Sequence, residues 1–457
     1  ITADGGCLLH AAALSRRADV LEAALGSLSA IGVDLNQQDS AGRTPLHVAV
    51  ASGLTELVQP LLRMRASTEV QADDGATPLR LAVSRGDLAL TSALIGVGAE
   101  RNSLGADAVP LLVLAAETSV PVALALVRAG ADLNVGDGTG RTALEVAVSR
   151  GETELCELLL TKGAKPTNRK DAAGNTSLHV AVANGYEGLV RLLVRHKAAL
   201  SEQNRRGQTP LILGAESGQS SVVELLLHSG APLHLCDASN RSALELALAS
   251  GHLDVLKILL QQSIVDVNGI TKRGSSLLHL AAELGDEARV QFLLGMQAQV
   301  DVVNPNGETP LHWACSLGHL AVVRALAQCG ANAMLHERVQ GLTPLHAACG
   351  SRGQPAVLAL LIQRCEAMGW SNLPQRCNLL DANRNTPLHT STKLAPQAAK
   401  YLPLLLEHGA NPNLQNAQGQ TVLHLLTERA VREAQEQQAV HGGDAVAGDG
   451  ALSEPAS

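Results

Sequence analysis

The sequence has 457 residues, enough for two to four ordinary domains or for one long array. Its 35 Lys and Arg against 43 Asp and Glu give a net charge of -8, which excludes a uniformly basic nucleic-acid coat. The 46% of hydrophobic residues excludes a disordered chain. Only two Trp, two Tyr and one Phe are present, so we expect a core of Leu, Ala and Val in thin layers.

The cysteines and the apolar segments indicate the compartment. Eight cysteines occur without any C-x-x-C pair, so we expect free thiols in a reducing compartment, cytoplasmic with a nuclear location possible. The most apolar window, residues 109–127, contains Glu117 and Pro121, so no membrane insertion is expected. The start shows no secretory signal, and residue 1 is Ile rather than Met, which indicates a fragment or a processed chain.

A four-residue motif recurs along most of the chain. Its clearest copies read Thr-Pro-Leu-His and begin at Thr44, Thr309, Thr343 and Thr386. Related copies begin at Cys7, Thr77, Thr142, Thr176, Thr209, Ser242, Ser276 and Thr421, and the most degenerate copy begins at Val109. Nine of the twelve spacings between these thirteen copies are 32 to 34 residues, which predicts a repeat protein.

Each repeat predicts two short helices followed by a polar turn. The Thr or Ser of the motif suits a helix N-cap, and the Pro after it suits the first helical position. A Gly such as Gly53 ends this helix, and a second apolar run such as residues 222–227 ends at a Gly-Ala pair, here Gly230-Ala231. A turn with Asp or Asn and Gly, such as residues 39–42, leads into the next repeat, and we call this projecting turn a finger.

The predicted fold is all-α, a solenoid of stacked antiparallel helix pairs with projecting β-hairpin-like fingers. One helix pair of this size cannot bury its own apolar faces, so neighbouring pairs must complete the core. We expect the array over residues 1–430, with an insertion near residues 365–381. Residues 431–457 predict a polar capping extension and, from about His441, a disordered tail.

The motif and its period resemble the ankyrin-repeat family, whose unit has about 33 residues and carries T-P-L-H-x-A. The resemblance covers about residues 5–430. It implies a concave face, made by the fingers and the first helices, that binds protein partners. No catalytic chemistry comes with this fold, so we expect no enzyme activity, no catalytic residue and no cofactor.

Histidine occupies the fourth motif position in eight copies, at His10, His47, His179, His279, His312, His346, His389 and His424. Because these residues are spread along a line, we interpret them as buried links between repeats and expect no metal site. Cys315 and Cys349 share a position where Ala or Val occurs elsewhere, and Trp313 shares one with Leu280. We therefore expect all three side chains in the core.

Basic residues gather in and beside the fingers of the middle repeats, at Arg141, Lys170, Arg205, Arg206, Arg241, Lys272 and Arg273. Residues one repeat apart become neighbours in a solenoid, so these charges predict a basic stripe over repeats 5 to 9. Such a stripe suits an acidic or phosphorylated peptide. Ordinary solvated loop charges are the alternative, and it stays open.

The insertion contains Trp370, one of only two tryptophans, and no repeat position explains it. Exposed, Trp370 could anchor a partner; buried, it would cover the core of the last repeats. The packing interpretation is favoured, and both stay open.

The sequence predicts a non-enzymatic scaffold or adaptor that docks protein partners on the finger face. A second hypothesis makes the array a regulatory module of a larger enzyme or channel whose active domain lies outside this sequence. Nucleic-acid binding is disfavoured, because few aromatic side chains are available to stack on bases. The sequence does not predict the oligomeric state.

Overall fold

The computed structural model describes residues 7–29, 34–350, 354–367, 375, 377–392 and 398–443. These residues form helices joined by loops, with no β-strand among them, so the all-α prediction is confirmed. None of these helices is long and apolar enough to cross a membrane. The chain divides into two compact units, Ile1–Ala238 and Ser239–Ser457, here called unit 1 and unit 2.

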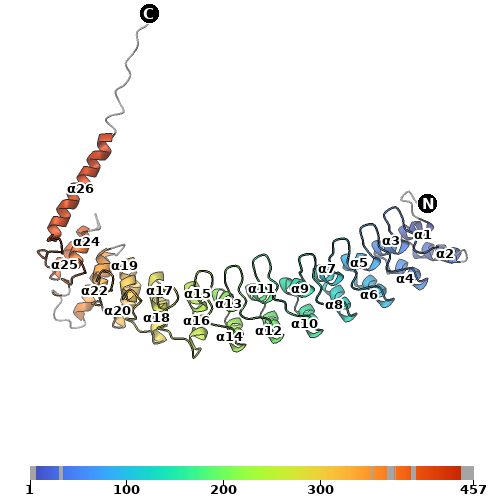
Figure 1. Ribbon diagram of the computed structural model, residues 1–457, viewed down its shortest axis with the longest axis horizontal. Helices are drawn as coiled ribbons and strands as arrows, with labels where there is room; N and C mark the ends of the chain where they lie inside the picture. The colour runs from blue at the N-terminus through green and yellow to red at the C-terminus, as the bar shows by residue number, and fades with distance from the viewer. Residues whose placement is uncertain are drawn as a thin grey trace, which may run out of the picture. The chain divides into compact units, whose positions relative to one another are not determined.

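Unit 1 consists of two rows of helices (Figure 1). The inner row, on the side of the fingers, holds the first helix of each repeat: α1 (Leu8–Leu14), α3 (Pro45–Ser52), α5 (Pro78–Ser84), α7 (Leu111–Thr118), α9 (Ala143–Arg150), α11 (Ser177–Ala183) and α13 (Pro210–Glu216). The outer row holds the second helices: α2 (Ala18–Ser29), α4 (Thr55–Arg63), α6 (Leu88–Gly96), α8 (Val120–Arg128), α10 (Thr153–Thr161), α12 (Glu187–Arg195) and α14 (Ser220–His228). Each inner helix contacts its own outer helix, and consecutive inner helices contact one another, which confirms the stacked pairs.

Unit 2 repeats this arrangement. Its inner helices are α15 (Ala243–Ser250), α17 (Leu277–Leu284), α19 (Pro310–Leu317), α21 (Pro344–Gly350), α24 (Pro387–Ser391) and α26 (Val422–Gly443). Its outer helices are α16 (Leu253–Leu260), α18 (Glu287–Gly295), α20 (Leu320–Gln328), α22 (Pro355–Ala367) and α25 (Ala398–Glu407). Helix α26 begins at the last motif copy, contacts α24 and continues to Gly443. Residues 444–457, where a disordered tail is predicted, lie outside the described residues.

The motif performs the predicted capping chemistry, as the second repeat illustrates. Thr44 is the N-cap of α3, and its hydroxyl accepts from the backbone N–H of His47. The backbone N–H of Thr44 donates in return to Nδ1 of His47, at 3.1 Å. Pro45 occupies the first helical position, and Gly53 ends the helix with a φ of 76°, which glycine adopts without strain. Each end of this short helix is therefore encoded locally.

The core is made of thin apolar layers between the two rows, with Leu46, Ala49, Leu57 and Leu61 fully buried in the second repeat. Cys315 and Cys349 are also fully buried, as predicted, and burial raises the pKa of both thiols. Their low thiolate fraction makes both groups unreactive.

Trp313 is not a core residue, so that prediction is wrong. Leu280 in the same position of the preceding repeat is buried, whereas Trp313 is only partly buried. Its indole Nε1–H donates to Oε2 of Glu308, in the preceding finger, at 3.0 Å. An indole is larger than the aliphatic side chain that fills this position in most repeats, and its N–H needs a polar partner.

The fingers are hairpin-like, although two isolated bridges, Leu104 with Pro110 and Gly136 with Thr142, are their only β-pairing among the described residues. In one typical finger, the backbone N–H groups of Ala41 and Arg43 donate to the carboxylate of Asp39, and Gly42 has a φ of 71°. Consecutive fingertips are joined through the backbone, since the N–H of Asp73 donates to the carbonyl of Ala41. The same bond recurs from Arg205 to Ala173 and from Ala238 to Arg206 in unit 1, and from Arg338 to Asn306, Ala382 to Gln340 and Ala417 to Asn383 in unit 2.

Candidate protein-binding surface

Seven of the eight motif histidines link consecutive repeats, as the sequence predicted. For His424 the prediction is wrong, because its ring is exposed and bonds Thr421 of its own repeat. Nε2 of His47 donates to the carbonyl of Ala76 in the next repeat at 2.9 Å, while Nδ1 faces the hydroxyl of Thr44 at 2.8 Å. His10, His179, His279, His312, His346 and His389 make the equivalent bond to the repeat that follows each of them. Burial lowers the pKa of His47, so its ring is neutral at pH 7. Among the described residues, no group of three or more His, Cys, Asp or Glu could hold a metal ion.

Two repeats of unit 1 build this link from other side chains. Arg80 donates from Nη1 to the carbonyl of Val109 at 2.7 Å, and its Nη2 pairs with the carboxylate of Asp107 at 2.5 Å. Glu145 accepts from the hydroxyl of Thr167 at 2.7 Å and pairs with Arg169 at 3.2 Å. Both substitutes place a side chain of one repeat against the next finger, so this position has a structural role.

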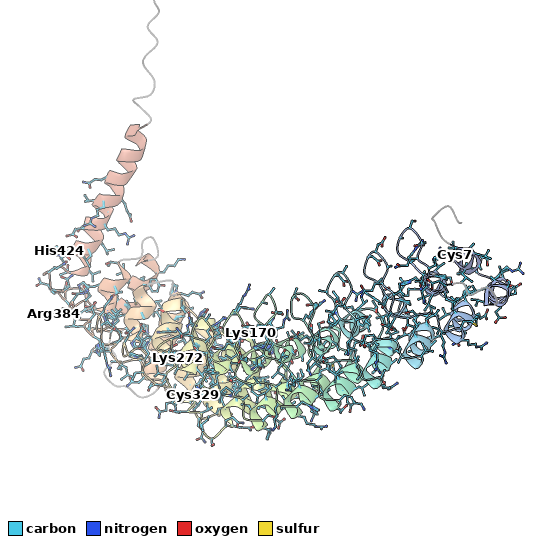
Figure 2. All side chains as sticks on the ribbon, turned by 45° about the vertical axis from the view of Figure 1, so that its right-hand side comes forward. Cys7, Lys170, Lys272, Cys329, Arg384 and His424 are labelled. Carbon is cyan, nitrogen blue, oxygen red and sulfur yellow. The ribbon has the colours of Figure 1, made fainter. Side chains whose placement is uncertain are left out.

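Two of the predicted basic residues of unit 1 are neutralised by neighbours. Arg141 pairs with Asp137 at 3.2 Å and with Glu117. Burial raises the pKa of Asp137, but hydrogen bonds from the Thr139 hydroxyl and from backbone N–H groups outweigh it and lower this pKa to about 2. Lys170, at the finger edge in Figure 2, pairs with Glu202 at 3.0 Å. These two cations already have carboxylate partners within the array.

Arg205 and Arg206 form a finger tip that presents two exposed cations, and no other finger tip in the described part of unit 1 does so. Neither guanidinium has an ion-pair partner among the described residues. Their backbone is fixed, because the N–H of Arg205 donates to the carbonyl of Ala173 and that of Arg206 donates to the side chain of Asn204. The Arg205-Arg206 finger tip therefore presents two positive charges from a fixed backbone, and no carboxylate of the described residues neutralises them.

The remaining predicted residues belong to unit 2. Lys272, labelled in Figure 2, and Arg273 are exposed on one finger, and neither has an ion-pair partner in the described part of the chain. Arg241 is partly buried. Trp370, the predicted aromatic anchor, lies outside the described residues.

A hollow of about 370 Å³ lies between inner helices and two consecutive fingers of unit 2. Trp313, Ala347 and Gly350 of the inner helices line it, together with Glu308, Glu337 and Val339 of the fingers. Glu308 is half-buried, and burial raises its pKa, but hydrogen bonds from Trp313 and Asn304 outweigh that effect, so its pKa lies below the usual value. No Lys or Arg of the described chain lines the hollow, which is therefore anionic.

The family model for ankyrin repeats (3 copies) matches residues 8–104, 79–171, 111–204, 167–237, 215–304 and 278–369. The chain belongs to the ankyrin-repeat family. Ankyrin repeats are generally protein–protein interaction modules, so the array has the fold of a binding protein.

Several ankyrin-repeat proteins are similar to the chain. Rabankyrin-5 of Homo sapiens is 30% identical over 459 residues, which cover 92% of this chain and 35% of the relative. Ankyrin repeat and SOCS box protein 11 of Danio rerio is 32% identical over 124 residues, covering 27% of this chain and 38% of the relative. The chain thus spans about a third of the length of these relatives. The crystal structure of the ankyrin repeat domain of Bcl-3 is 28% identical and covers 48% of this chain and 96% of that chain, with a TM-score of 0.44.

Sequence reasoning missed the hollow in the ankyrin array, although a signal for it is present. The residue after the motif His is Trp313 in one repeat and Ala347 in the next, so a large side chain stands beside a small one. Glu308 precedes that motif where other fingers carry Arg43 or Arg141. Comparing the same position in neighbouring repeats therefore indicates both the space beside Trp313 and the negative charge of Glu308.

Proposed function

We propose that this ankyrin array is a non-enzymatic scaffold or adaptor, and that an acidic or phosphorylated segment of a partner protein docks at the Arg205-Arg206 finger. The observation that supports this proposal is the pair of exposed guanidinium groups on a hydrogen-bonded finger tip, neither of which has an ion-pair partner among the residues that the structure describes. Guanidinium groups bind carboxylates and phosphates through two parallel hydrogen bonds, and a fixed backbone lowers the entropy lost on binding.

Lys170 and Arg141 serve as secondary contributors in this proposal. Because both already pair with carboxylates of the array, a partner must displace those pairs to gain from them. The contribution of each is therefore smaller than that of Arg205 or Arg206, since exposed ion pairs contribute about 1 kcal/mol or less.

The test reverses the double charge with Arg205→Glu and Arg206→Glu. Proteins captured from a lysate by the wild-type array are quantified beside those captured by the variant, at low and at physiological salt. We expect the specific partners to be depleted at least tenfold and the remaining capture to depend less on salt. Each captured partner is then tested as a purified protein before and after phosphatase treatment.

The matched control is the pair Lys162→Glu and Arg195→Glu, which changes the net charge equally at exposed positions of the outer row. This control should retain the partners. Equal capture by all three arrays would reject the Arg205-Arg206 finger as the docking site. An equal loss of captured partners in both variants would show that the effect comes from net charge and not from this finger.

A second candidate function is regulation of an enzyme or channel by the array. The chain spans 35% of Rabankyrin-5 and 38% of the SOCS box relative, so relatives of this array are longer proteins. The full reading frame tests this candidate directly, because an enzyme or channel domain in the same polypeptide would support regulation in cis.

A further inference from the structure

Trp313 is held at the border of the hollow in unit 2. Its indole N–H donates to Glu308 at 3.0 Å, and its ring meets the His279 ring edge to face, with the centroids 5.3 Å apart. The next inner helix contributes His346, Ala347 and Gly350 to the lining, and the two small residues leave space beside the indole. The aromatic group is thus fixed while part of its surface stays accessible.

The charge around this tryptophan is negative. Glu308 is half-buried and accepts from Trp313 and Asn304. Glu337 is 7% exposed and accepts the backbone N–H groups of Val339, Gln340 and Leu342. These neutral donors stabilise both carboxylates without cancelling their charge.

Among the residues that the structure describes, no positive charge lines the hollow to offset these carboxylates. The lining histidines, His312 and His346, are neutral at pH 7, because burial lowers the pKa of each. Arg338 is exposed at the tip of the finger that carries Glu337, and it is not part of the lining.

We propose that this hollow binds an arginine side chain of a partner protein, stacked on Trp313 and paired with Glu308. A guanidinium group matches both features, because it is planar, stacks on aromatic rings and is weakly hydrated, whereas an ammonium group is a compact and strongly hydrated point charge. Val339, 67% exposed beside the hollow, offers an apolar contact to the residue next to that arginine. The partner segment is therefore an arginine beside an apolar residue, a chemistry opposite to that proposed for Arg205-Arg206.

Fluorescence tests this proposal directly, because Trp370→Phe leaves Trp313 as the only tryptophan of the chain. The probes are a capped hexapeptide with an arginine followed by a leucine, and the same peptide with citrulline, the neutral isostere of arginine. We expect a saturable change in Trp313 fluorescence with the arginine peptide and at least threefold weaker binding of the citrulline peptide. Calorimetry on the chain that retains Trp370 repeats the comparison without relying on that substitution.

Two substitutions assign the binding to the hollow. Glu308→Gln keeps an oxygen to accept the indole N–H but removes the charge, so the arginine and citrulline peptides should bind equally. Trp313→Leu introduces the residue found at this position in other repeats, and calorimetry should show at least threefold weaker binding of the arginine peptide. Glu283→Gln, at an exposed carboxylate of α17 outside the hollow, is the matched control and should keep the preference.

Several outcomes would overturn the proposal. These are the absence of saturable binding up to millimolar peptide, equal binding of the two peptides to the unsubstituted chain, or loss of the arginine preference in Glu283→Gln as well. The result is independent of the Arg205-Arg206 site, because neither peptide carries an acidic group.

Discussion

The two units fill the fourth motif position differently, although they build the same stack of helix pairs. In unit 2, four consecutive repeats carry His279, His312, His346 and His389, and each ring bonds a backbone carbonyl of the next repeat. In unit 1 the position holds His10, His47, Arg80, Leu112, Glu145, His179 and Ile212. The stack therefore tolerates several ways of joining one repeat to the next.

The difference shows that the link has no single chemistry: several side chains donate to a backbone carbonyl of the next repeat, whereas Glu145 accepts from side chains there. Arg80 reaches the carbonyl of Val109 as His47 reaches that of Ala76, although the two side chains differ in length and charge. In unit 2 the four histidine links are consecutive, whereas in unit 1 the three histidine links, from His10, His47 and His179, are interrupted by repeats without a motif histidine. The units should consequently differ in their response to acid.

The largest expected effect is a loss of stability on acidification that is greater in unit 2 than in unit 1. Burial lowers the pKa of His279, His312, His346 and His389 in the folded protein, to about 4 for His346. Above the unfolded pKa of 6.5 both states are neutral; below it the unfolded chain binds more protons, so the free energy of unfolding falls until the folded pKa is reached. His346 alone contributes a loss on the order of 3 kcal/mol.

Hydrogen exchange followed by mass spectrometry at pH 7 and pH 5, corrected for the intrinsic exchange rate, measures this loss helix by helix. Protection should fall further in α17, α19, α21 and α24 than in α5, α7, α9 and α13 of unit 1, which carry no motif histidine. An equal fall in both units would contradict the assignment of acid sensitivity to the histidine links.

The next effect is the removal of one link, His346→Ala. We expect a loss of about 2–4 kcal/mol in the free energy of unfolding, because the change creates a cavity and leaves the Asn385 carbonyl and the Thr343 N–H without their histidine partner. Denaturant unfolding measures the loss. His424→Ala is the matched control, since this exposed ring bonds Thr421 of its own repeat, and it should cost about 0.5 kcal/mol or less.

A smaller effect is expected when unit 1 is given a histidine by Arg80→His. The imidazole can reach the Val109 carbonyl but loses the pair between Arg80 and Asp107, so we expect a cost of about 1 kcal/mol at pH 7. The variant should then lose stability below pH 6.5, whereas the wild-type repeat should not. Thermal melts at pH 7.5 and 5.5 measure both effects, and identical shifts at the two pH values would show that the new ring is not a buried link.

The smallest effect is local opening of α7 in unit 1. Its N-cap is Pro110, which has no side-chain cap bond, whereas α3 and α9 carry capping boxes from Thr44 and Thr142. A missing cap lowers helix stability by roughly 0.5–1 kcal/mol, so the first turn of α7 should exchange before those of α3 and α9 at neutral pH. Slower exchange in α7 than in α3 would contradict this.

The fold could be predicted from the sequence because its determinants are local and repeated. Thr44 caps the start of α3, Pro45 occupies its first position and Gly53 ends it, and each effect is local to that residue. Thirteen copies of the motif make the repeat period clear. The histidine links were equally predictable, since a polar side chain inside such thin layers needs a partner and the next finger is the nearest one.

The candidate site was less predictable because it depends on pairs that sequence spacing does not reveal. Arg141 is neutralised in part by Glu117, which is 24 residues away. Trp313 was expected in the core because Leu280 is there, but an indole exceeds that space and turns towards Glu308. The sequence shows which side chains are charged or aromatic. Contacts with neighbouring repeats decide which of the charges are neutralised and which of the aromatic rings are exposed.

The bonds between fingertips have a consequence for how such an array can diversify. They join main-chain atoms, as in Arg205 to Ala173 and Arg338 to Asn306, so any tip residue other than proline can form them. Evolution or a protein engineer can therefore exchange tip residues one repeat at a time. Such exchanges alter the specificity of partner binding and leave the hydrogen bonds between the finger backbones in place.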